Sequence, residues 1–122
     1  MAPEVAKSLP YNMKADTYSF GILFWEIMAL KRPFSKFTMK TLTEFVVNGN
    51  TRPKLEEDWS QNVKDLMQSC WASDLSKRPE FVEIKEQLQN ECYTGSEALA
   101  GYDSDTLNVS RKSYFFILAK GK

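Results

Sequence analysis

Few residue types in this chain of 122 residues could carry out chemistry, because the sequence contains no histidine. Histidine is the usual general acid and base near neutral pH, so its absence excludes Ser-His-Asp and Cys-His nucleophile systems as well as histidine-bound zinc. The two cysteines, Cys70 and Cys92, do not form a CxxC pair, which argues against a disulfide framework or a metal site. Asp103 and Asp105 could bind a cation weakly, but a lone acidic pair in a polar segment is usually just solvated. The residue types therefore predict no metal site.

The composition is typical of one globular domain. Hydrophobic residues make up 43 % of the chain and charged residues 26 %. Basic and acidic residues balance at 16 each, which gives no general reason to expect nucleic acid or a membrane as partner. The N-terminus has no apolar core after a basic start, so no signal peptide is predicted. Together with the unpaired cysteines, this favours a reducing, cytoplasmic setting.

The segment 14–30, KADTYSFGILFWEIMAL, predicts a helix that is apolar on every side. Such a helix is either buried all round or placed in a membrane. A membrane span needs roughly 20 apolar residues. Here the run is interrupted by Glu26 and ended by Lys-Arg-Pro at 31–33, so we expect a core helix. Asp16 is the expected N-cap.

Two further helices are predicted downstream. Thr41 and Glu44 match a capping box that would begin the first of them, with a left-handed cap at 48–49, Asn-Gly. Ser60 would cap the next helix, whose apolar residues recur at helical spacing. These apolar residues are Val63, Leu66, Met67, Cys70 and Trp71.

A fourth helix is predicted to begin at Pro79, which suits the first helical position. Its inward-facing residues would be Phe81, Ile84 and Leu88. The fold is thus predicted to be all-α, with about four helices. Small and polar residues without a sustained period predict a flexible tail at 91–122, with a short apolar end, YFFILA, at 114–119. That end reads either as a strand-like or docking segment or as an aggregation-prone stretch.

Three short motifs occur in order along residues 1–90. They are A-P-E at 2–4, D-T-Y-S-F-G leading to W-E at 16–26, and C-W-x-x-D-x-x-x-R-P-x-F at 70–81. Together they resemble the C-terminal part of the large lobe of a eukaryotic protein kinase, in the group of tyrosine-kinase-like Ser/Thr kinases. The motif residues are Ala2, Pro3, Glu4, Asp16, Gly21, Trp25, Trp71, Arg78 and Pro79.

The resemblance implies structural roles for these residues. Glu4 would form an ion pair with Arg78 and pin the end of the activation segment onto the last helices. Asp16 would hold the backbone of the catalytic loop in addition to capping its helix. The helix at 14–30 would be the scaffold of the large lobe, enclosed partly by segments that precede Ala-Pro-Glu. Gly21 is expected to allow close packing, and Trp71 resembles a core aromatic.

The resemblance also predicts that this chain alone is catalytically incompetent. Phosphoryl transfer needs a glycine-rich loop, a strand lysine, a catalytic aspartate and the Asp-Phe-Gly metal site, all of which precede Ala-Pro-Glu in the family. Ser19-Phe20-Gly21 imitates the last of these without its acidic residue, and no G-x-G-x-x-G occurs. We therefore expect no catalytic residue and no cofactor in this chain, MgATP being implied only for a full-length parent.

Two functional hypotheses remain, and a third hypothesis is that the chain is an unrelated helical domain whose motifs are coincidental. In the first, the chain is a truncated product or a gene-model fragment of a kinase that phosphorylates Ser/Thr of proteins, with Tyr left open. Its expected partner is then the missing upstream part of the kinase domain. In the second, it is a stand-alone interaction module, whose surface near residues 41–48 docks a protein substrate or a regulatory protein.

Overall fold

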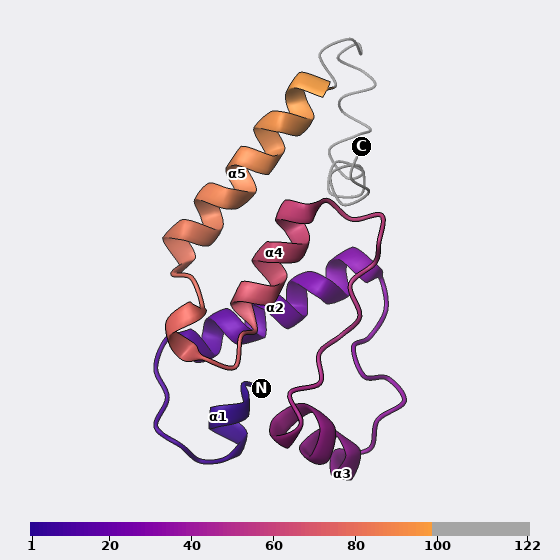
Figure 1. Ribbon diagram of the computed structural model, residues 1–122, viewed down its shortest axis with the longest axis vertical. Coiled ribbons are helices and arrows are strands. Elements are labelled where there is room, and N and C mark those ends of the chain that lie inside the picture. The colour runs from indigo at the N-terminus through magenta and orange to yellow at the C-terminus, as the bar shows by residue number, and fades with distance from the viewer. Residues whose placement is uncertain (99–122) are drawn as a thin grey trace.

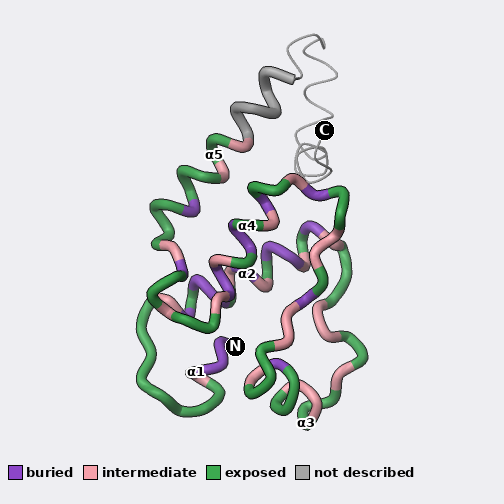
Figure 2. Tube along the Cα trace, in the orientation of Figure 1, coloured by how far each residue is buried: buried purple, intermediate pink, exposed green. Residues whose placement is uncertain are grey.

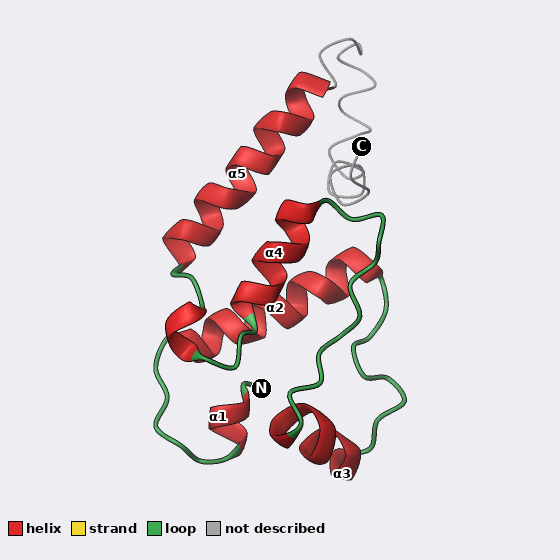
Figure 3. Ribbon diagram, viewed as in Figure 1, coloured by secondary structure: helices red, strands yellow, loops and turns green. Residues whose placement is uncertain are grey.

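The computed structural model describes the backbone of residues 1–98 and the side chains of residues 1–91. The described part is helical and contains no strand, which confirms the predicted all-α class (Figure 3). The predicted apolar end at 114–119 and most of the predicted tail lie outside the described residues. The elements are α1 (Pro3–Ala6), α2 (Lys14–Ala29), α3 (Met39–Thr41), the π-helix η1 (Leu42–Asn48), α4 (Gln61–Cys70), the 3₁₀ turn η2 (Leu75–Lys77) and α5 (Phe81–Ala98).

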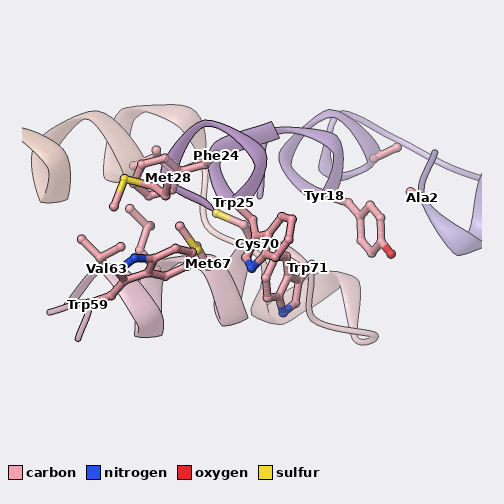
Figure 4. Close-up of a cluster of buried hydrophobic side chains, with 13 residues drawn as sticks. Ala2, Tyr18, Phe24, Trp25, Met28, Trp59, Val63, Met67, Cys70 and Trp71 are labelled. Carbon is pink, nitrogen blue, oxygen red and sulfur yellow. The ribbon is translucent and has the colours of Figure 1, made fainter. Parts of the chain in front are cut away.

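The core lies between α2 and α4, which cross in the middle of the molecule (Figure 1). The predicted apolar face of α4 is confirmed, because all five of its residues are buried. Phe24 and Met28 of α2 lie opposite Trp59, Val63 and Met67 (Figure 4). Ser60 caps α4 as predicted, since its hydroxyl accepts a hydrogen bond from the backbone N–H of Val63 at 3.3 Å.

The start of α2 differs from the prediction. The helix begins at Lys14 after the N-cap Met13, so Asp16 lies in the first turn, exposed, and is not the N-cap. The side-chain oxygen of Asn12 accepts a hydrogen bond from the backbone N–H of Lys14 at 2.9 Å, and this local turn starts the helix earlier.

The second predicted helix also begins and ends differently. The capping box joins Thr38 and Thr41, with the Thr41 hydroxyl accepting from the Thr38 backbone N–H at 2.7 Å, and Glu44 is not part of it. The chain then widens into the π-helix η1. Gly49 has a φ of −95°, so it is not the predicted left-handed cap; Asn50, with a φ of 58°, takes that conformation. Gly49 is needed for space, because a Cβ there would lie 2.8 Å from the Phe45 carbonyl oxygen.

The fourth predicted helix begins at Phe81 rather than at Pro79. The carboxylate of Glu83 accepts a hydrogen bond from the backbone N–H of Glu80 at 2.8 Å and so caps the start of α5. Ile84 is buried as expected, but Phe81 is 43 % exposed. The helix runs on to Ala98, into the range assigned to the tail.

One side of α2 is left uncovered by the described residues. Tyr18, Trp25 and the other inward residues are buried, whereas Leu23, Ile27 and Leu30 are 52 %, 51 % and 70 % exposed (Figure 2). We call these three residues the outer stripe of α2, although Leu30 is the left-handed C-cap that follows the helix, with a φ of 52°. The apolar residues on every side of this helix therefore have a partial enclosure, as the kinase resemblance predicts.

No helix within residues 1–98 is both long enough and apolar enough to cross a membrane.

Candidate functional site

The motif residues from both ends of the described chain meet in one buried ion pair. Arg78 Nη1 donates to Glu4 Oε1 at 2.7 Å and Arg78 Nη2 donates to Glu4 Oε2 at 3.1 Å. The residues are 1 % and 7 % exposed. The bidentate pair predicted from the resemblance is therefore present, and it joins positions 74 residues apart in the sequence. We call this pair the Glu4–Arg78 clamp.

Local structure sets the positions of both side chains. Pro3 suits the first position of the short helix α1, which places Glu4 in the opening turn. Arg78 follows the 3₁₀ turn η2, and two further donors are used: Nε donates to the Ala72 carbonyl at 2.8 Å and Nη1 to the Lys14 carbonyl at 3.0 Å. A buried guanidinium with this many acceptors is held in one orientation.

The first turns of α2 fasten the backbone at Arg78 and directly after it. Lys14 Nζ donates to the Arg78 carbonyl at 2.6 Å and forms an ion pair with Glu80. The Thr17 hydroxyl donates to the Pro79 carbonyl at 3.2 Å. The segment 78–80 is thus tied to α2 by side chains as well as by packing.

A second arginine lies close to the clamp. The guanidinium carbons of Arg52 and Arg78 are 5.0 Å and 5.1 Å from the centre of the Tyr18 ring, within the range of cation–π attraction. Arg52 Nε also donates to the Trp71 carbonyl at 3.0 Å. The Tyr18 hydroxyl and Arg52 Nη2 are buried without a hydrogen-bond partner, a cost that the cation–π contacts offset in part.

The electrostatics follow from burial and from these charges. Burial by itself raises the pKa of Glu4. The hydrogen bond from Arg78 and the charges of Arg78 and Arg52 lower the pKa by more than burial raises it, so the pKa lies below its usual value. Burial raises the pKa of Tyr18 and lowers the pKa of Arg52. The Glu4 carboxylate is therefore charged across the physiological pH range.

Most of the other motif residues are buried, whereas Asp16 is exposed and Pro79 is partly buried. Ala2 and Trp71 are 1 % and 4 % exposed, and Trp25 Nε1 donates to the Lys54 carbonyl at 2.8 Å. A Cβ on Gly21 would lie 2.8 Å from Cys70 Cβ, so the expected close packing is present. Burial raises the pKa of the Cys70 thiol to about 12.

The arrangement works as a structural anchor. Glu4 and Arg78 bind each other, and Arg78 also donates to the backbone carbonyls of Ala72 and Lys14. Within the described part of the chain no group of three or more Cys, Asp or Glu side chains could hold a metal ion. A groove of about 370 Å³ between α4 and α5 is lined by five polar residues and by Val63, Leu66 and Leu88.

Sequence reasoning missed three residues of this cluster: Lys14, Tyr18 and Arg52. Tyr18 stands within the D-T-Y-S-F-G motif, but nothing in its spacing indicates two arginines over its ring. Arg52 precedes Pro53 in a connection without periodicity, so no local signal places it near α2.

Comparisons with known proteins agree with this geometry. The family model for protein tyrosine and serine/threonine kinases matches residues 1–88. The serine/threonine-protein kinase STY46 of Arabidopsis thaliana is 38 % identical over 89 residues, which cover 73 % of this chain and 16 % of the relative. The dual specificity protein kinase shkB of Dictyostelium discoideum is 39 % identical over 89 residues, covering 71 % of this chain and 14 % of the relative. The serine/threonine/tyrosine-protein kinase HT1 of Arabidopsis thaliana is 36 % identical over 108 residues, covering 87 % of this chain and 28 % of the relative.

The chain thus spans only between 14 % and 28 % of the length of these relatives. Its matched region contains the clamp, the helices α2 and α4 and the first part of α5. The chain belongs to the protein tyrosine and serine/threonine kinase family, of whose large lobe it forms the C-terminal part.

Proposed function

We propose that the chain is a piece of a protein kinase whose full-length parent transfers the γ-phosphate of ATP to serine and threonine of proteins, with tyrosine as a further acceptor. The observation that carries the proposal is the Glu4–Arg78 clamp beside an α2 whose outer stripe is exposed. An anchored end of an activation segment next to a half-covered scaffold helix is the architecture of an incomplete large lobe. The relatives are named as serine/threonine, dual specificity and serine/threonine/tyrosine kinases, which supports this range of acceptors.

We further propose that these 122 residues alone do not transfer phosphate. The reaction depends on groups that position and neutralise the phosphates of MgATP. The sequence contains no glycine-rich phosphate loop and no Asp-Phe-Gly, so MgATP would be held by other parts of the parent. The setting in this proposal is the cytoplasm.

A chimera tests the kinase assignment. The segment of the STY46 kinase that matches residues 1–88 would be replaced by those residues, and phosphate transfer to a protein substrate would be measured. We expect activity to be retained, and we expect Glu4→Ala in the chimera to lower it by destabilising the lobe. A folded chimera without activity would contradict the assignment.

Thermal shift with MgATP tests the inactivity of the isolated chain. A ligand that binds only the native state stabilises it by RT ln(1 + [L]/Kd), so the melting temperature keeps rising with ligand concentration above Kd. We expect no concentration-dependent shift for the chain and a clear one for the active chimera, which is the control. A shift of the chain alone that rises with MgATP concentration would show that it has a nucleotide site.

A second candidate function is protein docking near residues 41–48. The surface of α3 and η1 exposes Met39 and Phe45, which are 78 % and 46 % exposed, and Phe45 contacts Phe37 at a ring distance of 6.1 Å. We propose that this surface binds a protein substrate or a regulatory protein of the parent kinase. In the active chimera, Phe45→Ala should weaken phosphorylation of a whole protein and leave a short peptide substrate unaffected. Equal effects on both substrates would rule the surface out.

A further inference from the structure

The segment that leads from α2 to α3 carries only basic charges. Residues 27–43 contain Lys31, Arg32, Lys36 and Lys40 and no acidic residue, although the whole chain has 16 basic and 16 acidic residues. All four basic residues are exposed. They lie on the segment that runs down one side of the molecule, away from α5 (Figure 1). Positive charge is therefore concentrated on one surface of a chain that has no net charge.

Three of these basic side chains have no acidic partner. Lys31 Nζ lies 3.8 Å from Glu56 Oε1, which neutralises part of its charge. Among the side chains that the structure describes, no carboxylate forms an ion pair with Arg32, Lys36 or Lys40. We call these three residues the basic patch. Their charges remain available to a negatively charged partner.

The basic patch is held in place beside apolar side chains. The Phe37 backbone N–H donates to the Phe34 carbonyl at 2.9 Å, and the centres of the two rings lie 5.2 Å apart. The Phe37 ring also contacts the ring of Phe45 on η1 at 6.1 Å, so the loop packs against the π-helix. Met39, which is 78 % exposed, directly precedes Lys40. The patch therefore offers charge and apolar area on a preformed backbone, which lowers the ordering cost of binding.

We propose that the basic patch binds an acidic segment of a partner protein, in which acidic side chains stand next to apolar ones. The proposal rests on the docking function proposed for residues 41–48 and names the chemical class of the partner. Carboxylates of the segment would pair with the patch, and its apolar side chains would cover Met39 and Phe45. Opposite charges across an interface speed association and help to select the partner.

The distribution of charge favours a protein segment over a uniformly anionic surface. Clusters that bind acidic lipids have about four to eight Lys and Arg side chains. The basic patch has only three. Phe34 and Phe37 are half-buried and pack on each other and on η1, so they are not placed to stack on the bases of a nucleic acid. Glu44 is exposed next to Phe45 and would repel phosphates, whereas a peptide can carry its acidic residues only where the patch lies.

Fluorescence anisotropy with the full chain tests the proposal. The probe is a short labelled peptide in which a block of glutamates adjoins leucine and phenylalanine, made in both block orders. Each peptide has a twin that carries glutamine in place of every glutamate. We expect a glutamate peptide to bind saturably and about tenfold more tightly than its twin at low salt, because several exposed ion pairs each contribute a few-fold. The difference should shrink as added salt screens the charges.

Charge reversal locates the site. Lys36→Glu combined with Lys40→Glu should weaken binding of the glutamate peptide about tenfold. The matched control, Lys7→Glu combined with Lys85→Glu, changes the net charge of the chain equally at exposed positions outside the patch and should not weaken binding. Far-UV circular dichroism would check the fold of each variant. If charge reversal unfolds the chain, Lys36→Gln combined with Lys40→Gln provides the milder variant.

Equal binding of the glutamate and glutamine peptides would overturn the acidic class of partner and leave the docking function of residues 41–48 standing. Absence of binding by every peptide, or equal weakening by both pairs of lysine substitutions, would also overturn the inference. Binding to vesicles of phosphatidylserine in the absence of peptide binding would assign the patch to a membrane instead. The phosphate-transfer assay with the chimera tests the kinase assignment independently of all these results.

Discussion

Removing the charge of Glu4 tests the Glu4–Arg78 clamp directly. The substitution Glu4→Gln keeps the shape of the side chain and one oxygen acceptor, but it leaves the guanidinium of Arg78 buried without a counter-ion. Arg78 is 1 % exposed, so water cannot replace the lost charge. The carbonyls of Ala72 and Lys14 remain as acceptors and reduce the loss without supplying a charge.

The expected loss is large compared with that for a surface pair. Breaking a buried ion pair by removing one partner costs about 3–5 kcal/mol. Because the amide and the two carbonyls keep some of the hydrogen bonds, we expect about 3 kcal/mol for Glu4→Gln, at the lower end of that range. The exposed pair between Lys31 and Glu56, 3.8 Å apart, gives the matched control. The same change there, Glu56→Gln, should cost less than about 1 kcal/mol.

Urea unfolding followed by tryptophan fluorescence measures both changes, since Trp25, Trp59 and Trp71 are all buried. If Glu4→Gln abolishes the folded baseline, the double change Glu4→Gln with Arg78→Met provides the second measurement. Removal of both charges should recover part of the stability, because no unpaired charge is left buried. Equal small losses for Glu4→Gln and Glu56→Gln would refute the reasoning.

The same pair gives a pH dependence with a definite sign. The pKa of Glu4 in the folded chain lies below its usual value of 4.5, so the folded state binds the proton more weakly than the unfolded state. The stabilisation is complete above pH 4.5 and is lost as the pH falls through the folded-state pKa. The difference in unfolding free energy between wild type and Glu4→Gln should therefore be constant near neutral pH and shrink below pH 4.5. A difference that grows on acidification would contradict this assignment.

Three further predictions concern the core and its caps. Gly21→Ala should destabilise the chain by about 1–3 kcal/mol, because the added Cβ would crowd Cys70. The control Ser19→Ala, on the exposed side of α2, should be neutral or stabilising. Stabilisation by Gly21→Ala would disprove the close contact. The buried Cys70 thiol has a pKa of about 12, so in a Cys92→Ser variant it should resist thiol reagents at pH 8 until urea unfolds the chain. Rapid labelling of the native protein would contradict this prediction. Ser60→Ala should cost about 1 kcal/mol through loss of the α4 cap, measured by the shift of the urea midpoint, and an unchanged midpoint would exclude a capping role.

Local patterns in the sequence predicted one helix almost completely. The spacing of apolar residues in 61–71, with Ser60 before them, predicted both the cap and the buried face of α4. This works because α4 is amphipathic, with one row of residues facing the core and the rest facing water. The spacing of apolar residues at i, i+3 and i+4 therefore indicates which face of the helix is buried.

Cap positions were harder to predict, because several residue types compete for the same backbone groups. Asn12 starts α2 ahead of Asp16, and the Thr38–Thr41 box replaces the one expected at Thr41 and Glu44. Each candidate satisfies the sequence rule, so the sequence alone does not tell which of the local hydrogen bonds forms.

The sequence by itself predicted the helical class, and the order of its motifs predicted the kinase family; the Glu4–Arg78 clamp was predicted only through the resemblance to that family. Only the tertiary structure decided that the guanidinium groups of Arg52 and Arg78 both lie over the ring of Tyr18. It also decided which side of α2 stays uncovered. Because α2 has apolar residues on every side, the spacing of these residues does not indicate which side is buried. Its buried side depends on which helices pack against it.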